Sequence, residues 1–415
     1  MRTLLVGIFT VIAISALAQR ECASSAYLEQ LKTSDIRFAE RINQIEAFVQ
    51  HHLSTSQLKI TGGTSNIIRI PVVVHVIYNN ASQNISDEQI KTQIDALNRD
   101  FRRQNADTVN TPDRFKSVAA DVQIEFALAT ADPFGRATTG IIRKKTNVTY
   151  WTSDDKIKFS SKGGDDAWDR NSYLNFWVGN LQNLLGYSSV PGSAANVDGV
   201  VINYGTFGTI NTAAPYNLGR TAVHEVGHWL GLRHVWGDTY CGDDLVDDTP
   251  KQGNFTSGCP SGFRSSCDNA PLGDMYMNYM DFTNDACLNL FTNGQKQRML
   301  SYFAEGGFRY SILSSRGLNA PWVAAAPPVV QTTPVATQFK FYPNPATAEI
   351  TLDFSFNENW LGKNISIVSI NGVIVSHILV NSKNQKINVS QLKAGMYFIE
   401  GLNDGEKIHE KFIKL

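Results

Sequence analysis

One histidine-rich segment of the chain has the residue types and the spacing of a metal site. It reads HEVGHWLGLRH, in which His224 and His228 lie four residues apart, so one face of a helix presents both imidazole rings. Gly231 can end that helix in the left-handed conformation, and His234 can then reach the same point. Three neutral imidazoles and one open position predict a catalytic zinc site. Glu225, beside the first ligand, is placed to accept the proton of the zinc-bound water as a general base.

The other histidines of the chain lack such a setting. His75 stands alone in a run of β-branched residues, which predicts a buried structural histidine. The remaining four are interpreted as solvated side chains: His51, His52, His377 and His409.

Periodic patterns predict the elements that must position the zinc site. Apolar residues indicate a helix at 218–230 and strands at 69–78, 122–128, 173–178, 184–190 and 199–204. Ser86 and Gln89 form a capping box that predicts the start of a further helix, which runs to Phe101. Residues 246–294 are typical of loops. This order predicts an α+β domain with a mixed twisted sheet and an active-site helix.

The first 66 residues are interpreted as two segments that are removed. A positive start at Arg2, an apolar stretch and the small residues of Ala16-Leu17-Ala18 favour a signal peptide at 1–18 over a buried helix or a membrane anchor. Residues 19–66 are polar with helical spacing and are interpreted as a propeptide. Its last part, 51–66, is rich in Ser, Thr and Gly and predicts a loose connector.

Composition and charge exclude other classes of protein. The 415 residues carry 37 basic and 38 acidic side chains, a net charge of −1, which argues against a general nucleic-acid binder. Hydrophobic residues make up 42% of the chain, enough for sizeable cores. No internal apolar run approaches the ~18 residues of a membrane span, so no transmembrane span is expected in the mature protein.

Several segments together resemble the pappalysin family of metzincin metalloproteases. They are HEVGHWLGLRHVWGD, the upstream DGVVINYGTFGT and LLGYSSVPG, and the downstream NYMDFTNDAC. The extended histidine motif marks metzincins, and the similarity covers residues 67–320, which are expected to form a metzincin-like catalytic domain. The resemblance implies a zinc endopeptidase that acts on proteins or peptides, with Met280 in a tight turn beneath the metal.

The resemblance also bears on the walls of the cleft. Residues 184–192 are similar to the family's edge strand above the cleft, which can pair with an extended peptide. The family commonly has a tyrosine two residues after the methionine, but here this position is Phe282, which lacks the hydroxyl. Tyr276 and Tyr279 are the candidates to replace it, and Asp285 is considered as the lining of a pocket for a basic side chain.

Four cysteines follow the predicted zinc helix, and four cysteines allow three pairings. A second zinc site is the alternative, but it lacks a close CxxC spacing. The family resemblance implies the disulfides Cys241–Cys267 and Cys259–Cys287.

The acidic segment CGDDLVDDTP offers hard oxygen ligands that suit calcium, and the resemblance implies calcium in this region. A solvated acidic loop is the alternative. The candidate ligands are Asp243, Asp244, Asp247, Asp248 and Thr249.

Cys22 is left over at the start of the predicted propeptide. A thiolate is a good zinc ligand and could fill the open fourth position, which would make the enzyme latent, as in some relatives of the family. The alternative is a spare or intermolecular cysteine.

The end of the chain predicts a linker and a small all-β sandwich. Residues 321–337 include the Pro-, Thr- and Ala-rich run AAAPPVVQTTPVAT. Within 338–415, about seven strands follow at short intervals, and Asn371-Gly372 predicts a hairpin. The segments FYPNP, SINGV, LKAGMYF and KFIKL resemble the sorting domain of the bacterial type IX secretion system, which implies this machinery as a partner. A carbohydrate-binding or adhesive sandwich is the alternative.

The sequence thus predicts a secreted or surface-attached zinc endopeptidase, made as a signal peptide, propeptide, catalytic domain and sorting domain. The alternative is a catalytically silent, zinc-containing adhesin displayed on the cell surface. Retention of Glu225 argues against an adhesin, and Phe282 is the one feature in its favour.

Overall fold

The computed structural model describes residues 22–55, 67–323 and 339–415, except 356, 371–372 and 404–405. The chain divides into two compact units, Met1–Ala325 and Ala326–Leu415. The predicted signal peptide, the connector after residue 55, most of the linker and the Asn371-Gly372 turn lie outside the described residues. Within the described ranges no helix is long and apolar enough to cross a membrane.

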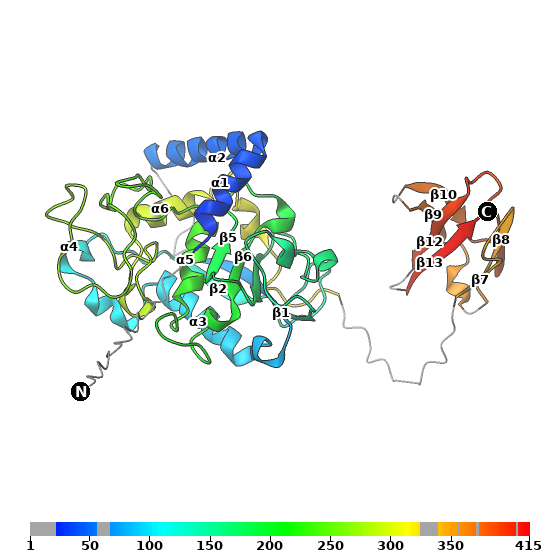
Figure 1. Ribbon diagram of the computed structural model, residues 1–415, viewed down its shortest axis with the longest axis horizontal. Helices are drawn as coiled ribbons and strands as arrows, with labels where there is room; N and C mark the ends of the chain where they lie inside the picture. The colour runs from blue at the N-terminus through cyan, green and yellow to red at the C-terminus, as the bar shows by residue number, and fades with distance from the viewer. Residues whose placement is uncertain (1–21, 56–66, 324–338, 356, 371–372, 404–405) are drawn as a thin grey trace, which may run out of the picture. The chain divides into compact units, whose positions relative to one another are not determined.

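A mixed six-stranded sheet forms the centre of the first unit (Figure 1). Its order is β2-β1-β4-β6-β5 with β3 also on β1, and every pair is parallel except β5 with β6. The long β1 is buried over most of its length, which explains its continuous run of Val and Ile. The predicted mixed sheet is confirmed, whereas β3 was not predicted. The strands are β1 (Ile68–Tyr78), β2 (Ile124–Leu128), β3 (Ile141–Lys145), β4 (Leu174–Gly179), β5 (Gly186–Ser188) and β6 (Val200–Asn203).

Helices α3 (Asp87–Phe101) and α5 (Arg220–Trp229) share a core with this sheet. Ser86 caps α3 by accepting the backbone N–H of Gln89. Only this half of the expected capping box is found at α3, and the buried Gln89 amide nitrogen donates to the Phe207 carbonyl oxygen. The shorter helices of this part are α4 (Asp113–Lys116) and α6 (Asn293–Ser301).

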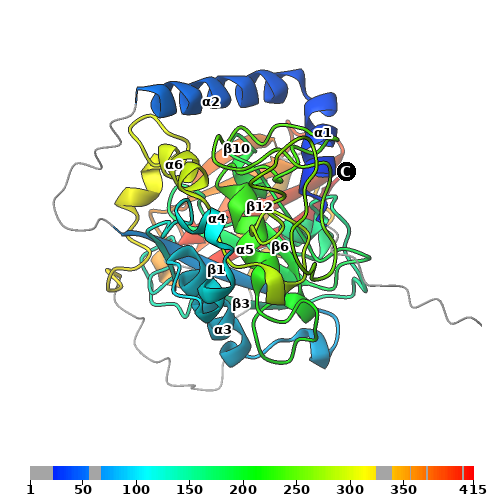
Figure 2. The same ribbon diagram turned by 90° about the vertical axis from the view of Figure 1, so that its left-hand side faces the viewer.

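Two further helices, α1 (Ser24–Ser34) and α2 (Ile36–Ser54), precede the sheet in sequence. Figures 1 and 2 show them along one side of the first unit, with α2 beside α6. The expected loose connector begins too early, because α2 continues through His51 to Ser54. One contact that favours this last turn is the stacking of the Phe48 and His52 rings, 4.8 Å apart at i,i+4 spacing.

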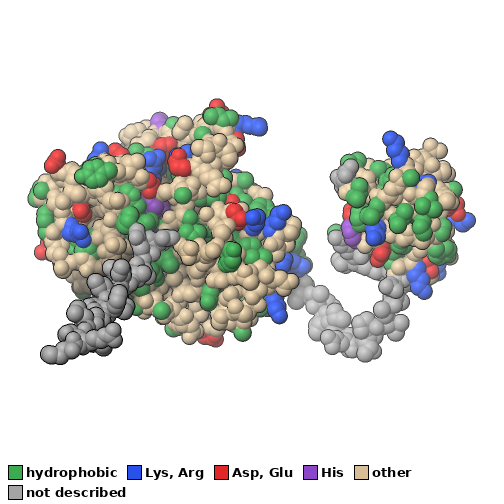
Figure 3. Space-filling model, viewed as in Figure 1, with side chains coloured by type: hydrophobic (Ala, Val, Ile, Leu, Met, Phe, Trp, Pro, Cys, Tyr) green, Lys and Arg blue, Asp and Glu red, His purple; other side chains and the backbone are tan. Residues whose placement is uncertain are grey.

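The surface of the first unit carries side chains of both charges, as the net charge of −1 for the whole chain suggests. Figure 3 shows acidic and basic side chains together on the face that it presents. This face therefore has no resemblance to the basic stripe of a nucleic-acid binder.

The second unit is an antiparallel β-sandwich with its own core. One sheet has the order β10-β9-β12-β13 and the other β11-β8-β7. Ile350 and Leu352 of β8 and Phe354 just after it alternate and are fully buried with Trp360, so the predicted all-β unit is confirmed. The strands are β7 (Lys340–Tyr342), β8 (Glu349–Asp353), β9 (Asn364–Ser369), β10 (Ile374–Leu379), β11 (Asn384–Asn388), β12 (Gly395–Asn403) and β13 (Glu406–Lys414).

Candidate metal centre and active site

Helix α5 and the turn after it bring three histidines together. His224 and His228 lie on one face of α5, and Gly231 ends the helical segment with a φ of 80°. A Cβ at residue 231 would lie 2.2 Å from the Tyr302 hydroxyl oxygen, so both the backbone and the packing require glycine there. The turn returns His234 to the first two rings, as the sequence predicts.

The three Nε2 atoms lie 3.1, 3.1 and 3.2 Å from one another. Zn–N bonds of about 2.0–2.1 Å in tetrahedral geometry hold nitrogens about 3.3 Å apart, close to these distances. Burial and the neighbouring His234 lower the pKa of His228 to about 4, so its imidazole is neutral near pH 7. Neutral, convergent imidazoles fit a zinc ion.

The opposite ring nitrogens are held by partners that fix each histidine. His224 Nδ1 donates to the Tyr279 carbonyl oxygen at 2.7 Å, and His228 Nδ1 donates to the Leu232 carbonyl oxygen at 2.9 Å. His234 Nδ1 faces Asp238 Oδ1 at 2.5 Å. These contacts direct the Nε2 lone pairs inward, as in known metal sites. Asp238 was not predicted, although its position four residues after His234 is a usable signal.

Met280 lies beneath the histidines, as the resemblance implies. It is fully buried, and a Cβ on Gly227 of α5 would lie 2.5 Å from its sulfur. Methionine and helix backbone are therefore in direct contact, which explains why a glycine precedes His228. A backbone turn from Asn278 to Asp281 shapes this floor, with Asp281 N donating to Asn278 O at 3.0 Å.

Asp281 connects the floor to the loop at residues 252–256. Its buried carboxylate accepts hydrogen bonds from the Gln252 side chain and the Thr256 backbone, at 2.8 and 2.7 Å. Burial nevertheless raises the pKa of Asp281 to about 7. No sequence pattern marked this residue as a structural anchor.

Phe282 is nearly buried beside the metal centre, and its ring centroid lies 4.9 Å from that of His234. Neither tyrosine considered as a replacement turns toward the histidines. Tyr279 packs on Phe291 and Arg220, and the Tyr276 hydroxyl donates to the Gly262 carbonyl oxygen. The centre therefore has an aromatic ring at residue 282 without a hydroxyl.

Glu225 lies between the histidines and β5. Its side chain is 1% exposed, and a Cβ on Gly186 of β5 would lie 3.0 Å from its Cγ. Its Oε2 accepts a hydrogen bond from the Ser24 hydroxyl at 2.8 Å. The carboxylate is thus beside the metal centre and also contacts the segment at the start of α1, residues 22–24.

That segment lies across the metal centre. The Cys22 sulfur and the histidine nitrogens all lie within 4.8 Å of one another, and no other such group occurs among the described residues. Ala23 N donates to Gly186 O at 3.2 Å, and Ser188 N donates to the Ser24 hydroxyl oxygen at 2.8 Å, so the segment pairs with the edge of β5. Burial, followed by the nearby Glu225, raises the pKa of the Cys22 thiol, so a thiolate there requires a cation.

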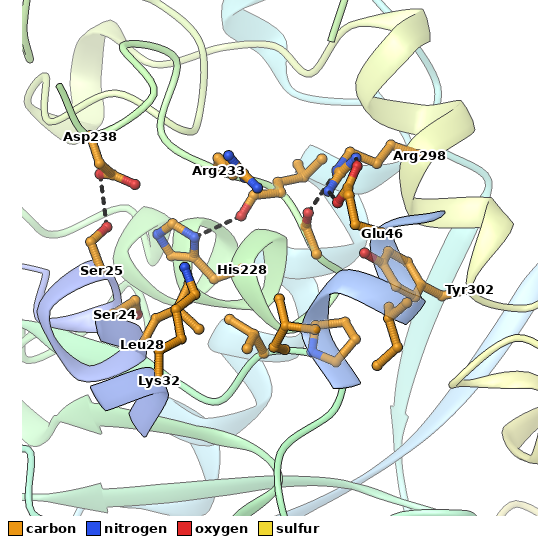
Figure 4. A pocket seen from close by; sticks show the side chains of 16 residues that line it. Ser24, Ser25, Leu28, Lys32, Glu46, His228, Arg233, Asp238, Arg298 and Tyr302 are labelled. Carbon is orange, nitrogen blue, oxygen red and sulfur yellow. Dashed lines mark hydrogen bonds and ion pairs between the residues drawn. The ribbon is translucent and has the colours of Figure 1, made fainter. Parts of the chain in front are cut away.

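A pocket between the N-terminal helices and the α5 region is lined by polar groups from both sides (Figure 4). Glu46 of α2 forms a two-pronged ion pair with Arg298 of α6, at 2.9 and 2.5 Å. Arg298 also donates to the Gly231 carbonyl oxygen at 2.8 Å. Ser25 donates to Asp238 at 2.8 Å. No local sequence pattern predicts these contacts, because their partners lie far apart in the chain.

Both disulfides implied by the resemblance are present, Cys241–Cys267 and Cys259–Cys287, each with a Cα–Cα distance of 5.7 Å.

The carboxylates of the acidic segment 241–250 do not converge on one point. Asp244 is buried and bonded to Thr249, whereas Asp248 accepts from the Thr292 hydroxyl and Gly294 N. The exposed carboxylates of this segment are Asp243 and Asp247.

Asp285 and His75 lie in the interior, where each has hydrogen-bond partners. Asp285 is buried and accepts hydrogen bonds from Leu218 N and Arg220 N at the start of α5. His75 is a buried core residue, as predicted, and its ring nitrogens face Asp165 and Asn175 at 2.7 and 3.1 Å.

Family models match two parts of the chain. The family described as pregnancy-associated plasma protein-A matches residues 158–304, and the secretion system C-terminal sorting domain matches residues 340–415. An extracellular metalloprotease of Verticillium alfalfae is 35% identical over 253 residues, which cover 57% of this chain and 76% of that protein. One from Pyricularia oryzae is 49% identical over 129 residues, but these span only 44% of its length.

Solved structures resemble the first unit. Mirolysin in complex with compound 9 is 50% identical with a TM-score of 0.60, and the match covers 62% of this chain and 99% of that one. A mutant of Tannerella forsythia promirolysin is 46% identical with a TM-score of 0.66, and the match covers 71% of this chain and 97% of that one. The share of this chain that is covered is therefore larger for the pro-form.

Proposed function

Because the chain belongs to the pregnancy-associated plasma protein-A family, the pappalysins, it is a secreted or surface-attached zinc metalloendopeptidase, and we propose that Glu225 is its general base. The single observation that carries this assignment is the buried Glu225 carboxylate between three convergent imidazoles and the edge strand β5. The zinc ligands on this proposal are His224, His228 and His234.

Each part of the site has a role in peptide hydrolysis. A zinc ion held by the three imidazoles supplies a Lewis acid that polarises the scissile carbonyl and acidifies water. Glu225 takes the proton of the attacking water and delivers it to the leaving amine. The edge of β5 pairs with the extended backbone of the substrate, as it pairs here with residues 22–24. Asp238 and the backbone carbonyls hold the histidine rings.

The general base is tested by Glu225→Gln in the mature enzyme. The amide keeps the shape of the side chain but cannot accept the proton, so kcat should fall by about 10²–10⁴-fold with the zinc content unchanged. Metal analysis and a peptide assay, with and without a chelator, measure both quantities. Substantial activity in the variant would falsify the assigned base. An unmodified protein that binds zinc but cuts no peptide would support the adhesin alternative.

We propose further that residues 19–66 are a propeptide and that Cys22 is the fourth zinc ligand in the latent form. Four ligand atoms within 4.8 Å support this, as does the larger coverage by the pro-form structure. Ser24 adds a second block, because its hydroxyl hydrogen-bonds the proposed base. On the same proposal, residues 1–18 are the signal peptide, 67–320 the catalytic domain, 321–337 the linker and 338–415 the sorting domain read by the type IX machinery.

Latency is tested by Cys22→Ala, with Ser24→Ala and the double variant for comparison. Loss of the thiolate should make the uncut zymogen partly active, and the double variant should be more active. X-ray absorption of the unmodified zymogen should show one sulfur at about 2.3 Å from zinc. A zinc shell of nitrogen and oxygen alone would contradict the thiolate.

Calcium at residues 243–249 stays a prediction. Its support is the hard oxygen chemistry of the acidic segment. A bound cation would need Asp244 to leave its present bond with Thr249 or to share it.

A further inference from the structure

Tyr27 of α1 fills a socket in the catalytic unit beside β5. Its side chain is only 4% exposed, although it belongs to the segment proposed to be removed. Its hydroxyl donates to Asp155 Oδ2 at 2.5 Å, and its ring lies 5.6 Å from that of Tyr187 on β5. The Lys158 ammonium lies 5.5 Å from the centre of the Tyr27 ring. None of these socket residues belongs to the metal centre.

The socket is built from buried charges as well as aromatic rings. Lys158 is fully buried, and its ammonium contacts Asp155 Oδ1 and the Val197 carbonyl oxygen, each at 2.8 Å. The same ammonium lies 5.0 Å from the Tyr187 ring centre and 5.4 Å from that of Trp177. Aromatic faces attract such a cation.

Asp155 has a φ of 62°, a left-handed conformation that aspartate adopts more readily than most residues, so the backbone here needs no ligand to explain it. A socket that only packed the propeptide would be filled as stably by apolar side chains, because burying Lys158 and Asp155 costs solvation.

The socket residues all follow residue 67, so they stay in the catalytic domain when the propeptide leaves. A carboxylate acceptor, a cation and two aromatic rings together match a phenol, whose hydroxyl donates and whose ring face attracts the cation. We infer that the socket is a subsite for a tyrosine side chain of a polypeptide substrate bound along β5. This inference rests on the proposed endopeptidase function and adds a preference to it.

The test compares peptide substrates of the mature enzyme that differ at one residue. Tyr, Phe or Ala is placed in turn at each position within about six residues of the scissile bond, and kcat/KM is measured. At one position Tyr should exceed Phe by about tenfold, the size expected for one hydrogen bond to a charged group, and Phe should exceed Ala. If every peptide is cut but no position prefers Tyr, the subsite is overturned and the endopeptidase function stands. If no peptide is cut, both proposals fall.

Asp155→Asn links any preference to the socket. The Tyr-to-Phe ratio of kcat/KM should fall severalfold in this variant, because a neutral amide oxygen replaces the charged acceptor. The ratio is taken within one enzyme, so a general loss of activity cancels. A ratio that stays near tenfold would overturn the assignment to Asp155. If the variant does not fold, the zymogen variant Tyr27→Phe is used instead: its cut propeptide should leave faster than the unmodified one, and an unchanged rate counts against the socket.

Discussion

The two walls of the active-site cleft are held by different kinds of contact. The helix wall, which we define as α5 and the turn at Met280, is fixed by residues of the catalytic unit itself. The Trp229 indole donates to Asp198 at 2.7 Å, and Arg309 stacks on the Trp229 ring at 3.8 Å. The strand wall, which is β5, is three residues long and has β6 on one side. Its other side is paired with residues 22–24 of the segment proposed to be removed.

The two walls differ in what peptide hydrolysis requires of them. The metal ligands must stay in place, whereas the strand paired with β5 must change. Metal ligands need a fixed geometry, so the helix wall is built of buried partners with few alternatives. On the proposed function, a peptide-binding edge must release one strand and accept another, so the partner of the strand wall would be a temporary one. Changes in the helix wall should therefore reduce the free energy of unfolding or weaken metal binding. Changes to side chains of the proposed propeptide itself should alter latency.

Gly231→Ala tests the rigidity of the helix wall most strongly. The methyl group would be forced against the Tyr302 ring, at a backbone φ of 80° that alanine disfavours. We expect a loss of about 2–4 kcal/mol in unfolding free energy and weaker zinc binding, measured by denaturant unfolding and metal titration.

Gly258→Ala is the matched control for this change. Gly258 has a similar φ of 73°, but nothing lies within 4 Å of the place that a Cβ would occupy, so only the backbone cost of about 1 kcal/mol remains. Equal losses in the two variants would show that packing against Tyr302 does not stabilise the wall.

Glu46→Gln tests how the proposed propeptide is held on the catalytic unit. It breaks an ion pair with an arginine that is 2% exposed, and a buried charge without its partner is costly. Although burial alone would raise it, the Arg298 guanidinium lowers the pKa of Glu46, so the pair is ionised at neutral pH. We expect the propeptide to bind about 1–3 kcal/mol more weakly, measured as residual activity of the uncut zymogen.

If residues 19–66 are removed as proposed, the mature enzyme has the same sequence whether or not residue 46 was changed, so its activity is an internal control. Glu29→Gln removes the exposed pair with Lys32 and should alter latency little. If the Glu46→Gln zymogen is as inactive as the Glu29→Gln zymogen, the Glu46–Arg298 ion pair does not contribute to latency.

The helix wall could be predicted from the sequence, whereas the strand wall could be predicted only in part. The spacing of His224, His228 and His234 and the glycine at 231 encode a local turn, and such features are visible within a short segment. The pairing of Cys22 with Gly186 joins residues far apart in the chain, and only the zinc chemistry of the thiol pointed to it. The Tyr27 socket and the Glu46–Arg298 pair have no local pattern.

The acidic loop after the helix wall gives a further test, through Asp244→Asn. Burial raises the pKa of Asp244 to about 7, from an ordinary value of 3.8. The stability from this raised pKa is complete below pH 4 and is lost as pH rises through 7, because ionising the buried carboxyl is costly. In calcium-free buffer the variant should therefore gain about 2–3 kcal/mol on the wild type between pH 5 and pH 8.

Thermal or denaturant unfolding at the two pH values measures this gain. Calcium then separates the two interpretations of the loop. If the predicted calcium site is correct, added calcium should stabilise the wild type and leave the variant unchanged. No relative gain with pH in calcium-free buffer would mean that Asp244 is solvated when it ionises.

Phe282→Tyr should give the smallest effect and tests the catalytic side of the helix wall. The ring lies 4.9 Å from His234 and 4.9 Å from Trp236, so the added hydroxyl would enter a packed aromatic group next to the metal centre. A hydrogen bond made only in the transition state raises kcat and leaves KM nearly unchanged. One such bond contributes about 1 kcal/mol, so we expect kcat to rise about fivefold. A folded variant with unchanged or lower kcat would show that the helix wall already stabilises the transition state without this hydroxyl, and that the phenylalanine is no sign of a silent enzyme.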